Sequence, residues 1–187
     1  MYAAWKSPRE RLEADVDGAA LGAFRIVLAC QVLWDVAWLA ATGGITERFF
    51  EPEFYFKYPY FEFVQPPTGL VPYVFFGAIA AAGMAVLVGW HTRISTKLLC
   101  AGVLYWFLID AAHYSDHGYL VCVASVFAAW LPVNRWMSSD RWVGREPRQT
   151  VPFWTLLLTR LQVFLVFFFS PLFVDILVRW RSTKDVF

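Results

Sequence analysis

Three ionisable side chains, Asp110, His113 and His117, follow one another at helical spacing in the second half of the chain. If one helix runs through them, positions i, i+3 and i+7 lie on the same helical face. A carboxylate and an imidazole can exchange protons near neutral pH, so the three are candidate catalytic residues for proton transfer. Two other interpretations stay open: a three-ligand metal site, or side chains that hydrogen-bond one another and cap a tight hairpin. We predict no metal, because no second pair of His or Cys residues completes a closed structural site.

A second candidate site is an aromatic segment earlier in the chain. Between Phe49 and Phe63, nine of the fifteen residues are Phe or Tyr, and Pro52 and Pro59 argue against a long helix there. One interpretation is a belt of amphipathic rings at a membrane interface. The other is a lid that recognises a flat apolar ligand such as a quinone. The cofactor-binding candidates in that lid are Phe54, Tyr55, Phe56 and Tyr58. The cofactor itself stays unknown, with a quinone or a bound lipid as the two possibilities.

The elements that position these residues must lie in a membrane. Hydrophobic residues make up 59% of the 187 residues and charged residues 17%, against roughly 45–50% and 25% in soluble domains. The aromatic fraction of 19% excludes a disordered chain. A net charge of +1 excludes a nucleic-acid binder that works by bulk charge. The composition therefore predicts that the chain is an integral membrane protein that contacts lipids.

The apolar runs predict an all-α domain over residues 1–187 with five membrane-spanning helices. A span needs about 20 mostly apolar residues. The predicted crossings are residues 19–42, 70–90, 98–112, 119–133 and 151–178. The polar stretch from His91 to Lys97 is taken as a connection, and the third and fourth crossings as a hairpin. Pro171 predicts a bend in the fifth crossing.

The distribution of Lys and Arg predicts that the N-terminus is cytoplasmic and the C-terminus outside. With five crossings, nine basic residues fall on the side of the N-terminus and five on the other side. The ionisable residues inside the crossings then separate by depth. Arg25 and Arg160 lie in the cytoplasmic half and are expected to bond helix carbonyls, Gln31 or Gln162, or to extend to the lipid headgroups. The alternative is that they bind an anionic lipid or neutralise a buried acid. Asp35 and Asp175 lie in the outer half, so either acid could join the Asp/His cluster at the outer face.

The second crossing carries small residues at every fourth position: Gly77, Ala81, Ala85 and Gly89. Small side chains on one face allow another helix to approach closely. We interpret the stripe as a packing face. A partner subunit or a flat cofactor on the same face is the alternative.

Four stretches resemble the horizontally transferred transmembrane (HTTM) domain family, which includes the membrane part of vitamin K-dependent gamma-carboxylase. They are ALGAFRIVLACQVLWDV (20–36), EPEFYFKYPYFEFVQPP (51–67), YWFLIDAAHYSDHGYLVCVASVFAAWLPVNRW (105–136) and VPFWTLLLTRLQVFLVFFFSPL (151–172). The resemblance implies five crossings and a cytoplasmic N-terminus. The residues that match are Arg25, Asp35, Asp110, His117, Asn134 and Arg160. A Lys associated with deprotonating vitamin K hydroquinone in the carboxylase aligns with Ala112. Because alanine takes no proton, we do not expect carboxylation.

Two functions stay open. The first is an accessory or structural subunit of a larger membrane complex, with other subunits packing on the small-residue face. The second is a membrane enzyme or quinone-handling protein that transfers protons through the outer-facing Asp/His cluster. The family's spread in bacteria predicts the bacterial inner (plasma) membrane as the location.

Overall fold

The computed structural model describes residues 7–50, 54–61, 63–144 and 149–164. In order, its elements are α1 (Pro8–Leu12), β1 (Asp15–Asp17), α2 (Ala19–Ala41), α3 (Gly44–Phe49), α4 (Val71–Val88), α5 (Thr92–Ile109), the 3-10 turn η1 (Ala111–His113), α6 (Asp116–Trp130), α7 (Ser139–Trp142) and β2 (Thr150–Pro152). A further apolar helix covers Phe153–Phe164. The described chain is mainly helical, as predicted, and β1 and β2 form one two-stranded sheet.

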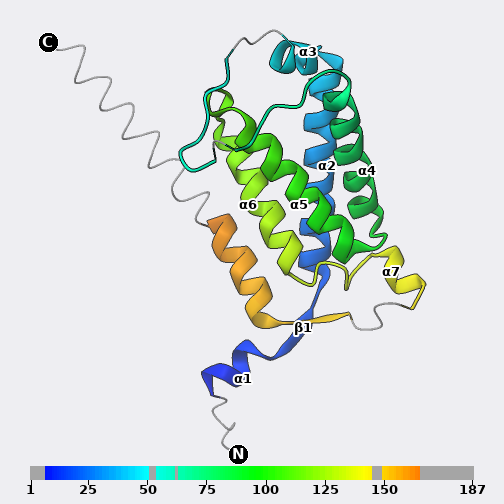
Figure 1. Ribbon diagram of the computed structural model, residues 1–187. Helices are drawn as coiled ribbons and strands as arrows, with labels where there is room; N and C mark the ends of the chain where they lie inside the picture. Colours follow the sequence, from blue (N-terminus) through cyan, green and yellow to red (C-terminus); the bar gives the residue numbers. More distant parts are fainter. Residues whose placement is uncertain (1–6, 51–53, 62, 145–148, 165–187) are drawn as a thin grey trace, which may run out of the picture. The chain divides into compact units, whose positions relative to one another are not determined.

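The chain forms two compact units, and their boundary falls within the two short strands. Of the described residues, one unit holds 7–15 and 152–164, and the other holds those between 16 and 151. In the larger unit α4 packs between α2 and α5, and α5 packs against α6 (Figure 1). Leu28, Phe76, Val103 and Val121, one from each of these four helices, belong to a single buried apolar core.

Among the described residues, three helices are long and apolar enough to cross a membrane: α2, α4 and α5. Helix α6 has 15 residues, which at ~1.5 Å per residue covers ~22 Å of a hydrocarbon layer ~30 Å thick. The fifth predicted crossing is helical over Phe153–Phe164. Its predicted bend at Pro171 and the acid Asp175 lie outside the described residues. Five crossings and the orientation therefore stay predictions.

The third crossing begins six residues earlier than predicted, because a residue distant in sequence caps it. The backbone N–H groups of His91 and Thr92 donate to the two carboxylate oxygens of Asp140, at 2.9 and 2.7 Å. A carboxylate at a helix N-terminus satisfies donors that have no partner within the helix and complements the helix dipole. The Thr96 hydroxyl, which is buried, donates to the Thr92 carbonyl at 2.7 Å. The polar stretch from His91 to Lys97 is thus the start of a helix, and its interpretation as a connection was wrong.

The small-residue stripe of α4 does not form the main packing face within the described bundle. Gly77 and Ala81 are exposed, and a side chain at Gly77 would have no neighbour within 4 Å. The buried face of α4 includes Phe76, Ile79 and Gly83. A Cβ atom on Gly83 would lie 3.1 Å from the Leu33 side chain of α2. The close approach of α2 to α4 therefore occurs at Gly83. The outer part of the stripe, Gly77 and Ala81, is not covered by the described residues of this unit.

Candidate functional site

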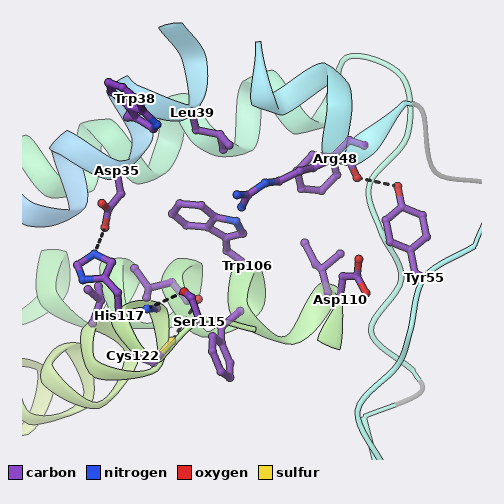
Figure 2. Close-up of a pocket in the computed structure, with 16 residues that line it drawn as sticks. Asp35, Trp38, Leu39, Arg48, Tyr55, Trp106, Asp110, Ser115, His117 and Cys122 are labelled. Atoms are coloured by element: carbon purple, nitrogen blue, oxygen red, sulfur yellow. Dashed lines mark hydrogen bonds and ion pairs between the residues drawn. The ribbon is translucent and has the colours of Figure 1, made fainter. Parts of the chain in front are cut away.

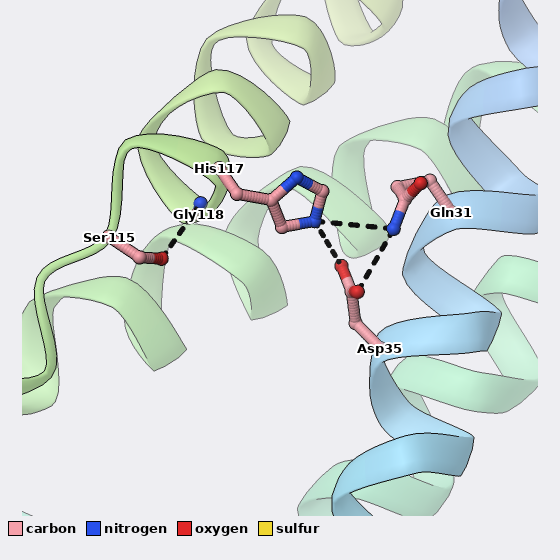
Figure 3. Close-up of polar contacts among 5 residues, drawn as sticks. All are labelled: Gln31, Asp35, Ser115, His117 and Gly118. Carbon is pink, nitrogen blue, oxygen red and sulfur yellow. Dashed lines mark hydrogen bonds and ion pairs between the residues drawn. The ribbon is translucent and has the colours of Figure 1, made fainter.

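The structure brings His117 of α6 against Asp35 of α2, although 82 positions separate them in the chain. His117 Nε2 lies 3.1 Å from Asp35 Oδ2. Gln31, one helical turn before Asp35, donates from Nε2 to Asp35 Oδ1 at 3.0 Å, and its Nε2 lies 3.2 Å from His117 Nε2 (Figure 3). The His117 side chain is 55% exposed and that of Asp35 is 22% exposed. The three side chains form a small polar network between α2 and α6.

This network requires one proton between His117 and Asp35. A single ring nitrogen cannot donate to Asp35 and accept from Gln31 at the same time. If Nε2 carries the proton, it donates to Asp35, and Gln31 is left to donate to the other carboxylate oxygen. If Nε2 carries no proton, it accepts a hydrogen bond from Gln31. In that case Asp35 Oδ2 must carry the proton, because a charged carboxylate oxygen would otherwise face the lone pair of Nε2. Nε2 of His117 and Oδ2 of Asp35 therefore form a pair of atoms between which a proton can move.

Asp110 has a different position from the one that helical spacing predicts. Helix α5 ends at Ile109, and Asp110 is extended, with φ −144° and ψ 116°. Its Oδ1 accepts from the backbone N–H of Ala112 at 3.0 Å and from that of Phe56 at 3.1 Å. The single helical face through Asp110, His113 and His117 therefore does not exist, because the chain turns between them. Asp110 caps the turn and holds the aromatic connection. The side chain of His113 lies outside what the structure describes.

The four aromatic candidates do not lie together over one site. Tyr55 donates its hydroxyl to the Arg48 carbonyl at 3.2 Å. Tyr58 stacks on Phe107 of α5, with 5.6 Å between ring centroids. Phe54 and Phe56 are exposed and pack edge-to-face on each other at 5.2 Å. Of the four, Tyr55 alone lines the cavity described next.

A cavity of about 200 Å³ opens beside the polar network. Its polar lining includes Asp35, His117 and Asp110, and its aromatic lining includes Trp106 and Tyr55. Figure 2 shows the Arg48 side chain extending from α3 toward Trp106. The site thus combines an acid–imidazole pair, a cation and aromatic walls at the end of the bundle where α3 and the α5–α6 hairpin lie (Figure 1).

The environment of Tyr55 keeps its hydroxyl protonated. Burial raises the pKa of Tyr55, and the negative charge of Asp110 raises it further. A neutral phenol at this wall donates hydrogen bonds, as it does to the Arg48 carbonyl.

Sequence reasoning missed three residues of this site: Gln31, Arg48 and Trp106. The spacing of Gln31 and Asp35 at i, i+4 on a predicted helix is a signal that could have paired them. Arg48 and Trp106 have no such signal, because α3 and α5 are brought together only by the fold. Within the described part of the chain, no three His, Cys, Asp or Glu side chains gather as a metal site requires.

Arg25 lies away from this cavity and is fully buried. It donates from Nη2 to the Met137 carbonyl at 2.5 Å and interacts electrostatically with Asp140. Its partner is therefore a loop carbonyl, where a helix carbonyl or a glutamine was expected. Its interaction with the buried acid Asp140 agrees with the alternative prediction, that Arg25 neutralises a buried acid. Arg160 is exposed on its helix.

A bundle of apolar helices with an acid–imidazole pair at one end defines a helical membrane module with a polar cavity. A family model, the HTTM domain, matches residues 14–175. Since this match covers most of the chain, the chain belongs to the HTTM domain family, as the resemblance predicted. No solved structure matches the chain.

Proposed function

We propose that this chain is a membrane module that binds a ring-headed amphipathic molecule of the quinone or hydroquinone type in the α3-end cavity. In this proposal His117 exchanges a proton with the bound ring. The observation that carries the proposal is the Asp35–His117 pair on the wall of an aromatic cavity.

The pair suits proton exchange because Asp35 occupies only one of the two ring nitrogens. A carboxylate hydrogen-bonded to one nitrogen orients the imidazole. Nδ1 is then the nitrogen that exchanges a proton with a ligand oxygen. Gln31 donates to Asp35 and thereby fixes the carboxylate. Position 112 needs no base in this arrangement, and carboxylation is not part of the proposal.

The size and lining of the cavity favour a ring over a whole lipid. Its volume of about 200 Å³ lies below the ~300–1,000 Å³ that is usual for drug-sized ligands. A single aromatic headgroup fits such a space, while an apolar tail would remain in the bilayer. Trp106 and Tyr55 offer faces and edges for ring packing, and Arg48 offers a positive charge for an ionised ring oxygen.

Binding can be tested with a short-tailed 1,4-naphthoquinone added to the purified protein in detergent. Saturable quenching of tryptophan fluorescence is expected, because Trp38 and Trp106 line the cavity. Trp106→Leu should weaken binding roughly 5- to 10-fold through the loss of ring packing. The matched control is Trp142→Leu, since Trp142 of α7 is 90% exposed. Equal loss in both variants would mean partition into the micelle and would contradict the proposal.

A second candidate function is an accessory or structural subunit of a larger membrane complex. It is supported by the outer part of the α4 stripe, where Gly77 has open space and Ala81 is exposed. The double variant Gly77→Leu/Ala81→Leu should then reduce co-purification of a partner in mild detergent. Ala23→Leu, which enlarges an exposed position on α2, should not. If the purified chain is monomeric and carries no partner, this candidate is wrong.

The location is proposed as a bacterial inner membrane, with the N-terminus in the cytoplasm. The excess of Lys and Arg on the predicted cytoplasmic side supports the orientation. In that orientation the α3-end cavity opens on the outer side. A cysteine-labelling reagent that does not cross membranes tests it. Gly43→Cys should react in intact cells and Gly144→Cys only after lysis.

A further inference from the structure

Asn134 is a buried amide on the wall of a second hollow, between the start of α5 and the segment that follows α6. The volume of this hollow is about 550 Å³. Helix α5 supplies one wall, and the chain from Ala129 to Asn134 supplies the other. The described residues that line it are all different from those of the α3-end cavity. The hollow is therefore a separate site from the one proposed for proton exchange.

The Asn134 side chain lacks a partner within the described part of the protein. The residue is 3% exposed, and among the described residues no hydrogen bond joins its amide to another group. A side-chain amide carries two N–H donors and a carbonyl acceptor. Buried polar groups are nearly always hydrogen-bonded, because burial without a partner is costly. The amide thus requires a partner that enters the hollow.

The other polar side chains of the hollow are held inside the protein or reach water. The hydroxyls of Thr92 and Thr96 both have hydrogen-bond partners in the protein. Arg93 is already engaged by an interaction within the chain. Lys97 is exposed, and its long side chain can keep the ammonium group in water. Recognition in the hollow therefore falls to the Asn134 amide, which is neutral and needs no charged partner.

The hollow adjoins the apolar outer surface of α5. Ile94 and Leu98 are 59% and 62% exposed, and Ala101, which lines the hollow, is exposed on the same helical face. Helix α5 is long and apolar enough to cross a membrane. Trp130, also on the lining, is 85% exposed, as is common for indole rings at the membrane–water interface. An occupant of the hollow therefore comes from the bilayer, with its polar part at the interface.

The ester region of a glycerolipid combines the two properties that this hollow requires. Its carbonyl oxygens lie at the interface and accept hydrogen bonds from N–H donors, and its acyl chains begin directly beneath them. The α5 wall beyond the two threonines includes Cys100, Ala101 and Leu104, which suit a hydrocarbon chain. We infer that the hollow binds one membrane glycerolipid by this region. An ester carbonyl accepts a hydrogen bond from Asn134 Nδ2, an acyl chain lies along Ala101 and Leu104, and the headgroup charge is not read.

Native mass spectrometry of the whole protein in detergent tests the inference with two lipids that differ only in their linkage. Ester-linked dioleoylphosphatidylcholine should be retained as one lipid per chain. Its ether-linked analogue has no carbonyl oxygen and should bind roughly 3- to 10-fold more weakly, for the loss of one hydrogen bond. In Asn134→Leu the two lipids should bind equally. The matched control Gln65→Leu replaces an exposed amide outside the hollow and should keep the preference for the ester.

Two results of this comparison would overturn the inference. Equal binding of the ester and ether lipids to the unmodified chain would mean that water satisfies the Asn134 amide. A preference for the ester that persists in Asn134→Leu would mean that another group reads the carbonyl. Phosphatidylglycerol of the same chains should bind as tightly as phosphatidylcholine, and a strong preference for phosphatidylglycerol would contradict recognition through the ester.

A second pair of variants tests the apolar part of the site. Ala101→Leu fills the space for the acyl chain and should weaken binding of both lipids, whereas Ala23→Leu, at an exposed position on α2, should not. Full binding to Ala101→Leu would contradict the position of the acyl chain. Thermal unfolding confirms that each variant is folded. Because the two sites are separate, Asn134→Leu should bind the naphthoquinone as the unmodified chain does.

Discussion

His117 Nε2 and Asp35 Oδ2 lie 3.1 Å apart because the α5–α6 hairpin returns the chain toward α2. The first turn of α6 carries His117, and its N-terminus is fixed by the Ser115 hydroxyl, which accepts from the Gly118 N–H at 3.0 Å. The pair therefore depends on the cap of a helix as well as on the two side chains.

Replacing Asp110 should loosen the aromatic connection without unfolding the bundle. In Asp110→Ala, the N–H groups of Phe56 and Ala112 lose their acceptor. We expect faster amide hydrogen exchange at residues 54–61 and 110–115, by about tenfold or more for loss of one or two hydrogen bonds. Hydrogen-exchange mass spectrometry measures it. Unchanged exchange at residues 54–61 would show that Asp110 does not hold the connection.

The cap that Asp140 provides for α5 should contribute measurably to stability. Asp140→Ala leaves the N–H groups of His91 and Thr92 without their acceptors, which costs about 1–2 kcal/mol in comparable caps. Asp140→Asn retains one acceptor oxygen and should lose less. Asp15→Ala, a change of an exposed carboxylate on β1, serves as the control. Denaturant unfolding in micelles compares the free energies, and equal values for Asp140→Ala and the control would refute the cap.

Two glycines with similar backbone angles should respond differently to alanine. Gly43 has φ +73° with open space around it, whereas Gly89 has φ +77° in a crowded site. A Cβ on Gly89 would lie 2.7 Å from the Ser138 Cα and 2.5 Å from Arg25 Nη1. Both variants pay the left-handed strain of ~1–2 kcal/mol, and Gly89→Ala adds an overpacking cost of ~1–3 kcal/mol. The melting temperature of Gly89→Ala should therefore be clearly lower than that of Gly43→Ala. The reverse order would contradict the close packing around Gly89.

Alkaline pH should weaken the aromatic connection through Tyr55. Burial, and then the charge of Asp110, raises the pKa of Tyr55 in the folded protein. The contribution of the neutral Tyr55 hydroxyl to folding stability is therefore complete below the ordinary tyrosine pKa of about 10. It is lost as pH rises through the raised value. Tyr55→Phe cannot ionise there, so its stability should fall less steeply above that pH. The control Tyr60→Phe changes a ring that is 93% exposed, so its free energy of unfolding should vary with pH as that of the unmodified chain does. The same pH profile for Tyr55→Phe and the unmodified chain would contradict the prediction.

Hydropathy predicted α2 and α4 well, because both are apolar over most of their length. The predicted crossings at 19–42 and 70–90 correspond to α2 (Ala19–Ala41) and α4 (Val71–Val88). The start of α5 was missed because Asp140, which caps it, lies 48 positions away from Thr92 in the chain. Short-range composition cannot reveal such a cap.

The site was predicted only in part for a similar reason. Depth alone suggested Asp35 as a neighbour of His117, and the structure places them together. The helical spacing of Asp110 with His117 failed because the hydrogen bonds of Asp110 favour a turn over a continued helix. Arg48 lines the cavity from α3, a six-residue helix that directly precedes the aromatic segment and that hydropathy did not predict.

The proton-exchanging role of His117 is tested most directly with 4-nitrophenol, a redox-inert ring phenol whose ionised form has its own absorption band. If His117 takes the ring proton, the imidazolium favours the phenolate, so the bound probe should ionise at lower pH than the free probe. In His117→Gln the pKa of the bound probe should return to or above its free value, whereas the control His91→Asn should retain the shift. A bound-probe pKa that is the same in His117→Gln as in the unmodified chain would contradict the proposed function.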